Sequence, residues 1–152
     1  MGLSLQFLIG PPKEMLDALS AYDYAKLDQL TEKKADFSLH LQPMDLQTLS
    51  DCAADYASQP LKPFRTALTC YLDEPDCGFF LVGSDWADAI AAIDISKSND
   101  ITAAWFAKMA ENYPDEQIGG PSAAAEKAVH DLIELCQYGL QFQKPVIHIW
   151  GL

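Results

Sequence analysis

Apolar residues follow two different spacings along the chain. Every second residue is apolar over 3–9 and 35–41, and short apolar runs cover 79–82 and 146–150, which is typical of strands. Elsewhere apolar residues recur every three or four positions, which predicts helices with one buried side. These helices begin at residues that suit a first turn or a cap: Pro11-Pro12, Pro43, Ser84 or Asp85, Asn99 or Asp100, and Ser122.

Breakers and turn residues predict where several elements end. The first helix has a break near Ser20-Ala21-Tyr22, and the last helix is expected to stop at Gly139. Residues 73–78, DEPDCG, predict a turn. Residues 62–72 fit both a helix and a strand, and we prefer a short helix there because apolar residues share one helical face.

Together these elements predict an α+β fold, with several helices packed on a small mixed sheet that includes the N- and C-terminal strands. A chain of 152 residues, 49% hydrophobic and 21% charged, fits one globular domain over residues 1–152. The strand at 146–150 has Ile147 and Ile149 on one face and Val146 and Trp150 on the other. A strand that is apolar on both faces lies inside a sheet that is covered on both sides.

One imidazole interrupts this apolar strand. His148 shares a face with Val146 and Trp150, and a lone histidine in such a setting is usually a hydrogen-bonded core residue rather than a ligand. A functional role would need a second polar group near it. His40 is the candidate, because it points away from the core face of its own predicted strand.

The charge balance narrows the kind of partner. The chain has 22 acidic and 10 basic side chains and a net charge of -12. Such a surface repels the phosphates of nucleic acids and anionic lipids, so no nucleic acid and no membrane is expected as a partner. It favours a basic protein partner, although acidity also serves solubility alone. Nothing in the sequence sets the oligomeric state.

The sequence indicates a cytoplasmic protein. No stretch reaches the roughly 20 apolar residues of a membrane helix, and the N-terminal segment has no basic residue ahead of its apolar part, as a secretory signal would. The cysteines, Cys52, Cys70, Cys77 and Cys136, form no CxxC pair and are expected as free thiols.

No catalytic, metal or cofactor motif stands out. Cys77 is a candidate nucleophile by its place in a turn, but the neighbouring Asp73, Glu74 and Asp76 would raise its pKa. The same turn lacks oxygen ligands where a calcium loop needs them, and the histidines and cysteines are too scattered for zinc. We therefore expect no metal and no cofactor, and His40, His148 and Cys77 remain the only candidates for catalysis.

Carboxylates gather in one part of the sequence. Asp73, Glu74 and Asp76 in the turn, with Asp85 and Asp88 soon afterwards, suggest an acidic recognition surface with Trp86 as its aromatic anchor. The alternative is a solvated turn followed by carboxylates that stabilise the positive end of a helix dipole.

Several short motifs follow one another in a distinctive order. They are Met1-Gly2 ahead of a strand and a Pro-led helix, the GFFLV strand at 78–82, Tyr113-Pro114 after an aromatic helix, and VIHIW after the last helix. Together they resemble the YfbM-like family of uncharacterised bacterial proteins. Residues 34–61 depart from that pattern. The resemblance implies a bacterial α+β protein and supplies no catalytic residues.

Two functions follow from the sequence. The first is a non-enzymatic module that binds a basic protein through Asp73, Glu74, Asp76, Asp85, Trp86 and Asp88, as an immunity- or inhibitor-type protein does. The second is a small-molecule-binding protein or hydrolase-like enzyme, with His40, His148 and Cys77 in a pocket beside the sheet.

Overall fold

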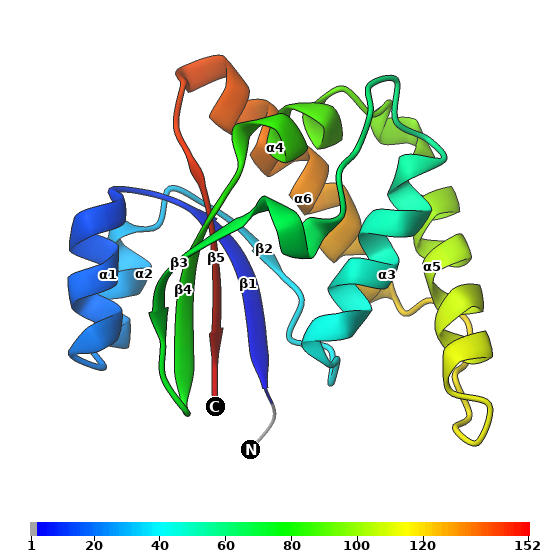
Figure 1. Cartoon of the computed structure of the whole chain (residues 1–152), viewed down its shortest axis with the longest axis horizontal. Helices are drawn as coiled ribbons and strands as arrows, with labels where there is room; N and C mark the ends of the chain where they lie inside the picture. The colour runs from blue at the N-terminus through cyan, green and yellow to red at the C-terminus, as the bar shows by residue number, and fades with distance from the viewer. Residues whose placement is uncertain (1–2) are drawn as a thin grey trace.

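Two segments from opposite ends of the sequence lie side by side in the sheet. The computed structural model describes residues 3–152, and in it β1 (Ser4–Ile9) pairs with β5 (Val146–Gly151) (Figure 1). The other strands are β2 (Lys33–Asp36), β3 (Leu68–Asp73) and β4 (Cys77–Val82), in the order β2-β1-β5-β4-β3. The expected α+β fold with both terminal strands in the sheet is confirmed. Every pair of neighbouring strands is antiparallel, so the sheet is not the mixed one expected.

Two short helices cover one face of the sheet. They are α1 (Pro12–Ser20) and α2 (Tyr24–Leu30), and the expected break between them is confirmed (Figure 1). Met15 and Leu19 of α1 pack on Ile147 and Ile149 of β5 in the smaller of two hydrophobic cores.

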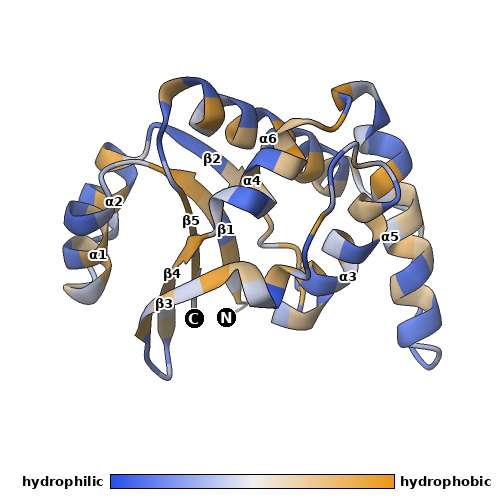
Figure 2. Cartoon of the chain, turned by 45° about the horizontal axis from the view of Figure 1, so that its top comes forward, coloured by the Kyte–Doolittle hydropathy of each residue, from blue (hydrophilic) through white to orange (hydrophobic). Residues whose placement is uncertain are grey.

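The opposite face carries the larger core. Its helices are α3 (Pro43–Ala54), α4 (Ser84–Ala91), α5 (Ser98–Asn112) and α6 (Ala123–Phe142), with the short 3₁₀ helices η1 (Phe64–Ala67) and η2 (Ile95–Lys97) between them. Phe7, Trp86 and Trp105 are buried there. Because β5 lies between β1 and β4 and is covered on both faces, the prediction of an inner strand at 146–150 is confirmed (Figure 2).

The preference for a helix over 62–72 is wrong for most of that segment. Only Phe64–Ala67 is helical, and Leu68–Asp73 is an edge strand that pairs with β4 from Leu68 opposite Val82 to Asp73 opposite Gly78. A bulge between Cys70 and Leu72 interrupts the alternation of the strand. The disturbed spacing explains why the segment resembled a helix.

The second strand is shorter than expected. It ends at Asp36, whose carboxylate accepts a hydrogen bond from the Ser38 backbone N at 3.0 Å and turns the chain. His40 lies beyond it with a φ of 61°, in the left-handed region, so it does not belong to a strand. The expected core positions Phe37 and Leu41 are nevertheless buried.

The last helix does not stop at Gly139. It continues to Phe142, and Gln143 ends it in the left-handed conformation. Gly139 lies inside the helix, where α6 passes close to Lys144 and Ile9 and leaves no room for a side chain. A Cβ at this position would lie 2.9 Å from the Lys144 carbonyl oxygen and 3.2 Å from Ile9 Cδ1. At its other end, Ser122 accepts a hydrogen bond from the Ala125 backbone N at 3.1 Å, as expected of a cap.

In the part of the chain that the structure describes, no helix combines the length and the apolar character needed to cross a bilayer. Met1-Gly2, which contribute to the family resemblance, lie outside the described residues.

Candidate functional site

His148 lies in the larger core, within a shell of aromatic rings. The β5 register points its side chain to the face that carries Phe7, and the two ring centroids are 4.9 Å apart. Phe64 of η1 lies 5.4 Å away and Phe80 of β4 lies 6.1 Å away. The imidazole is 4% exposed, and its Nδ1 is 3.0 Å from the Gln6 backbone oxygen. The prediction of a hydrogen-bonded core histidine is confirmed.

The protonation of His148 follows from these contacts. A carbonyl oxygen only accepts, so Nδ1 carries the proton and donates to Gln6. Burial lowers the pKa of the imidazole to about 4, while the Gln6 carbonyl opposes this change only in part. The ring is therefore neutral near pH 7, and Nε2 presents a lone pair.

A cavity opens beside this lone pair. It has a volume of about 320 Å³ and lies between the start of α3, η1 and strands β3 to β5. We call it the His148 cavity, and its lining residues are Pro43, Met44, Gln47, Phe64, Arg65, Leu68, Phe80, His148 and Trp150. Within residues 3–152, each fully buried side-chain nitrogen or oxygen has a hydrogen-bond partner. Since Nε2 has none among the described residues, it is not fully buried, and we assign its open side to the His148 cavity because His148 lines that cavity.

Arg65 is the charged residue of this cavity. It is the only arginine in the sequence, and its guanidinium forms no ion pair with any residue from 3 to 152. Its backbone N donates to the Gln47 side-chain oxygen at 3.0 Å, and Gln47 in turn donates to Asp51 at 2.8 Å. These hydrogen bonds connect η1 to α3 and fix the position of the Arg65 backbone.

His40 does not join His148. It lines a different cavity of about 410 Å³ with Tyr113, Asp45 and Glu116, on the side of α3 that faces α5. There the Tyr113 hydroxyl donates to the Asp45 carboxylate at 2.8 Å, and this bond raises the pKa of Tyr113. The structure therefore does not form the shared pocket expected of the two histidines.

Cys77 is also separate from both histidine cavities. It is buried in the smaller core on the other face of the sheet, beside Phe79 and Ile149. Burial, and after it the Asp76 carboxylate, raises the pKa of the thiol. A protonated, enclosed thiol is a poor nucleophile, so Cys77 does not supply one.

The expected acidic recognition surface is divided. Asp73, Glu74 and Asp76 lie at the β3–β4 turn, whereas α4, with the other two carboxylates, follows the opposite end of β4. A strand of six residues separates the two groups by roughly 20 Å. Trp86 is not an exposed anchor: it is 3% exposed, and its indole nitrogen donates to the Ser50 hydroxyl at 3.0 Å.

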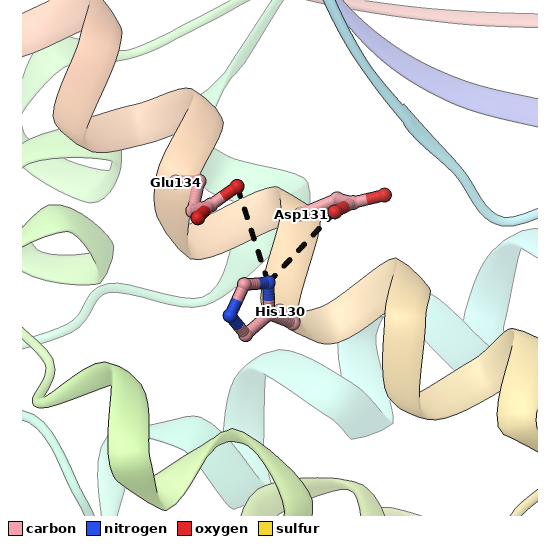
Figure 3. Close-up of side chains that lie close together, drawn as sticks. All are labelled: His130, Asp131 and Glu134. Atoms are coloured by element: carbon pink, nitrogen blue, oxygen red, sulfur yellow. Dashed lines mark ion pairs between the residues drawn. The ribbon is translucent and has the colours of Figure 1, made fainter.

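One turn of α6 brings together three side chains that can ligate a cation. The donor atoms of His130, Asp131 and Glu134 lie within 4.8 Å of one another (Figure 3). The His130 Nδ1 is 3.8 Å from Asp131 and 4.0 Å from Glu134. Lys127 already forms an ion pair with Asp131, and all three groups are accessible to water, so they are satisfied without a cation.

Sequence reasoning missed most of the His148 cavity. The sequence pattern places Phe80 in an apolar strand and Phe64 in the segment 62–72, and it assigns no role to Arg65. Arg65 is the only arginine in a chain of net charge -12, but nothing in its sequence neighbourhood points to His148. The spacing of His130 and Glu134, four residues apart, is visible in the sequence and places both side chains on one face of a helix.

Comparison with family models, with curated proteins and with solved structures found no match to this chain. The resemblance to the YfbM-like family therefore stays a prediction.

Proposed function

We propose that this protein binds a small organic molecule in the His148 cavity. One observation carries the proposal: a neutral imidazole, fixed through Nδ1, presents an unpartnered Nε2 to an otherwise mainly apolar cavity. Ligand sites are typically concave, apolar and supplied with a few placed polar groups, and a volume of about 320 Å³ falls in their usual range.

The chemistry of the cavity favours binding over catalysis. A base whose conjugate acid has a pKa of about 4 removes protons poorly near neutral pH. Among the described residues, no Ser, Thr, Cys, Asp or Glu lines the cavity to act as nucleophile or second acid–base group. The unpaired cysteines of the described chain support a reducing, cytoplasmic setting for this binding protein.

The test is a screen of small organic fragments by protein-observed NMR. We expect some fragments to shift the resonances of Phe64, Phe80, His148 and Trp150 together. Met44→Trp should abolish these shifts, because Met44 lines the cavity, is 73% exposed and can place a larger ring in its mouth without entering the core.

The control is His40→Ala, which removes an imidazole from the other cavity. It should leave fragment binding unchanged. The proposal fails if no fragment reaches the His148 cavity of the wild-type protein, or if Met44→Trp binds the same fragments equally well.

A second candidate function is the binding of a basic protein through one part of the expected acidic surface. Asp73 and Glu74 are exposed in the β3–β4 turn, and Asp76 is half-buried beside them. The Tyr22 hydroxyl donates to Asp76 at 2.9 Å, which holds the turn against the α1–α2 connection. We propose this turn as the part of the chain that would meet a basic protein partner, as in an immunity-type inhibitor.

Affinity capture at low and moderate salt tests the second candidate. Reversing Asp73, Glu74 and Asp76 to Lys should release a basic partner that the wild type retains at low salt. Reversal of Asp28, Asp55 and Asp115, which are exposed and far apart in sequence, is the matched control. Equal loss of the partner in both triple variants would indicate a general charge effect and remove the turn as a site.

A further inference from the structure

We infer that the ligand of the His148 cavity is an organic monoanion: a carboxylate bound by Arg65, a flat apolar body, and an N–H or O–H group that donates to His148 Nε2. This inference rests on the proposed function and names the class of ligand. Three features of the cavity support it independently.

The first feature is charge. Asp and Glu make up 22 residues of the chain, yet none of those in the described part lines this cavity, where Arg65 is the only charged side chain. The nearby Lys62 differs from it, because Lys62 forms an ion pair with Asp85 at 3.3 Å. A guanidinium without a protein counter-ion presents a planar set of donors that matches a carboxylate.

The second feature is the shape of the apolar surface. Phe64, Phe80 and Trp150 contribute three aromatic side chains to the cavity, and Leu68 and Pro43 add aliphatic surface. Aromatic rings pack well against other flat rings, by offset stacking or edge contacts. A ligand with a planar body is therefore favoured.

The third feature is the lone pair of Nε2. Because Nδ1 donates to Gln6 and the ring is neutral, Nε2 can only accept a hydrogen bond. An apolar molecule that covered it would leave a buried acceptor unpaired, which weakens binding. The cavity therefore selects a ligand that carries a donor as well as the carboxylate.

The net charge of the protein limits the charge of the ligand. A protein with a net charge of -12 repels anions, and a single arginine offsets that electrostatic field only locally. Nucleoside phosphates with a terminal phosphate and other phosphate monoesters carry about two negative charges, more than one guanidinium neutralises. One negative charge, placed at Arg65, an exposed residue in an otherwise mainly apolar lining, is the arrangement that the cavity fits.

Isothermal titration with three matched probes tests the inference. Indole-3-acetate has the carboxylate, the planar ring and the N–H donor; indole-3-acetamide lacks the charge, and the 1-methyl derivative of the acid lacks the donor. We expect the acid to bind at least about tenfold more tightly than the amide, because a charge-assisted hydrogen bond is stronger than a neutral one. The acid should bind roughly threefold to tenfold more tightly than the methylated acid, which cannot donate to Nε2.

Two pairs of variants assign these preferences to residues. Arg65→Gln should remove the preference for the acid over the amide, whereas Lys62→Gln, which removes a charge three residues away, should keep it. His148→Asn retains a donor for Gln6 but lacks Nε2, so it should remove the preference for the free N–H over the methylated ring. Chemical shifts of Phe80 and Trp150 confirm that the probe occupies the cavity.

The outcomes separate the two proposals. If the amide binds in the cavity as tightly as the acid, or if Arg65→Gln keeps the preference, the monoanion class is overturned while a binding cavity remains. If none of the three probes shifts the cavity residues although fragments do, the class is again overturned. If neither probes nor fragments bind there, the proposed function fails as well.

Discussion

At the scale of single residues, His148 combines burial with an unsatisfied acceptor. Its Nδ1 is bound to Gln6 and its ring is enclosed by Phe7, Phe64 and Phe80, yet Nε2 faces a cavity. The burial of this residue could be predicted from the apolar strand around it. Its cavity could not, because Trp150 comes from the same strand but Phe64 and Phe80 come from η1 and β4, which are distant in sequence.

The buried imidazole should make the stability of the protein depend on pH. Its pKa is about 4 in the folded protein, against an ordinary value of 6.5. Between these values the unfolded chain binds a proton that the folded protein does not. The free energy of unfolding should therefore fall as the pH is lowered from about 6.5 to about 4, by about 3 kcal/mol, and this contribution should change no further below that range.

Urea unfolding at pH values from 7 to 4 measures this effect. The carboxylates of the chain also titrate in acid, so the wild type is compared with His148→Asn, which keeps a donor for Gln6 but has no imidazole. The wild type should lose more stability than the variant. His40→Asn is the control for an exposed histidine and should follow the wild type; parallel curves for all three proteins would contradict the prediction.

At the scale of elements, β4 and β5 meet where a glycine lies beside a tryptophan. Gly78 is paired with Trp150, and a Cβ on Gly78 would lie 2.1 Å from the Trp150 indole nitrogen and 2.8 Å from Phe80 Cε2. The indole therefore lies over the glycine. The same ring lines the His148 cavity, so this contact between strands also shapes the site.

Gly78→Ala should displace the Trp150 ring. We expect a loss of about 1–3 kcal/mol in the free energy of unfolding, because the added methyl group overlaps the indole and the neighbouring phenyl ring. Binding of cavity ligands should weaken at the same time. Urea unfolding and the fragment titrations measure the two effects.

Gly120→Ala is the matched control for this change. A Cβ at Gly120 meets no atom within 4 Å, so the variant should keep its stability within about 0.5 kcal/mol of the wild type. Equal stability of the Gly78 and Gly120 variants would show that the indole moves aside without cost.

Element boundaries show where sequence patterns were insufficient. The bulge in β3 breaks the alternation that identifies a strand, so residues 68–73 resembled part of a helix. Gly139 looked like a stop signal, but it is the point of close approach between α6, Ile9 and Lys144. In both cases a neighbour that is distant in sequence decided the local structure.

At the scale of the whole molecule, the sheet separates two hydrophobic cores, one on each face, and its two ends carry different groups of carboxylates. The smaller core lies under α1 and α2 and contains Cys77, while His148 packs against Phe7 in the larger core. The acidic turn between β3 and β4 lies at one end of the sheet and α4 follows the other end. Groups that are close in sequence are thereby placed far apart, which is why the expected acidic surface does not form as one patch.

The sequence by itself determined the α+β class, the terminal strands in the sheet, most helices, the cap at Ser122, and the burial of His148. These features depend on spacing, capping and turn chemistry within short segments, and such preferences are local. The caps expected at Ser84 or Asp85 and at Asn99 or Asp100 are wrong, because Gly83 and Lys97 hold those positions. Only the tertiary structure decided the antiparallel strand order, the separation of His40, Cys77 and His148, and the meeting of Arg65 with His148 in one cavity. Those outcomes depend on contacts between segments that are distant along the chain, and one sequence carries no local signal for them.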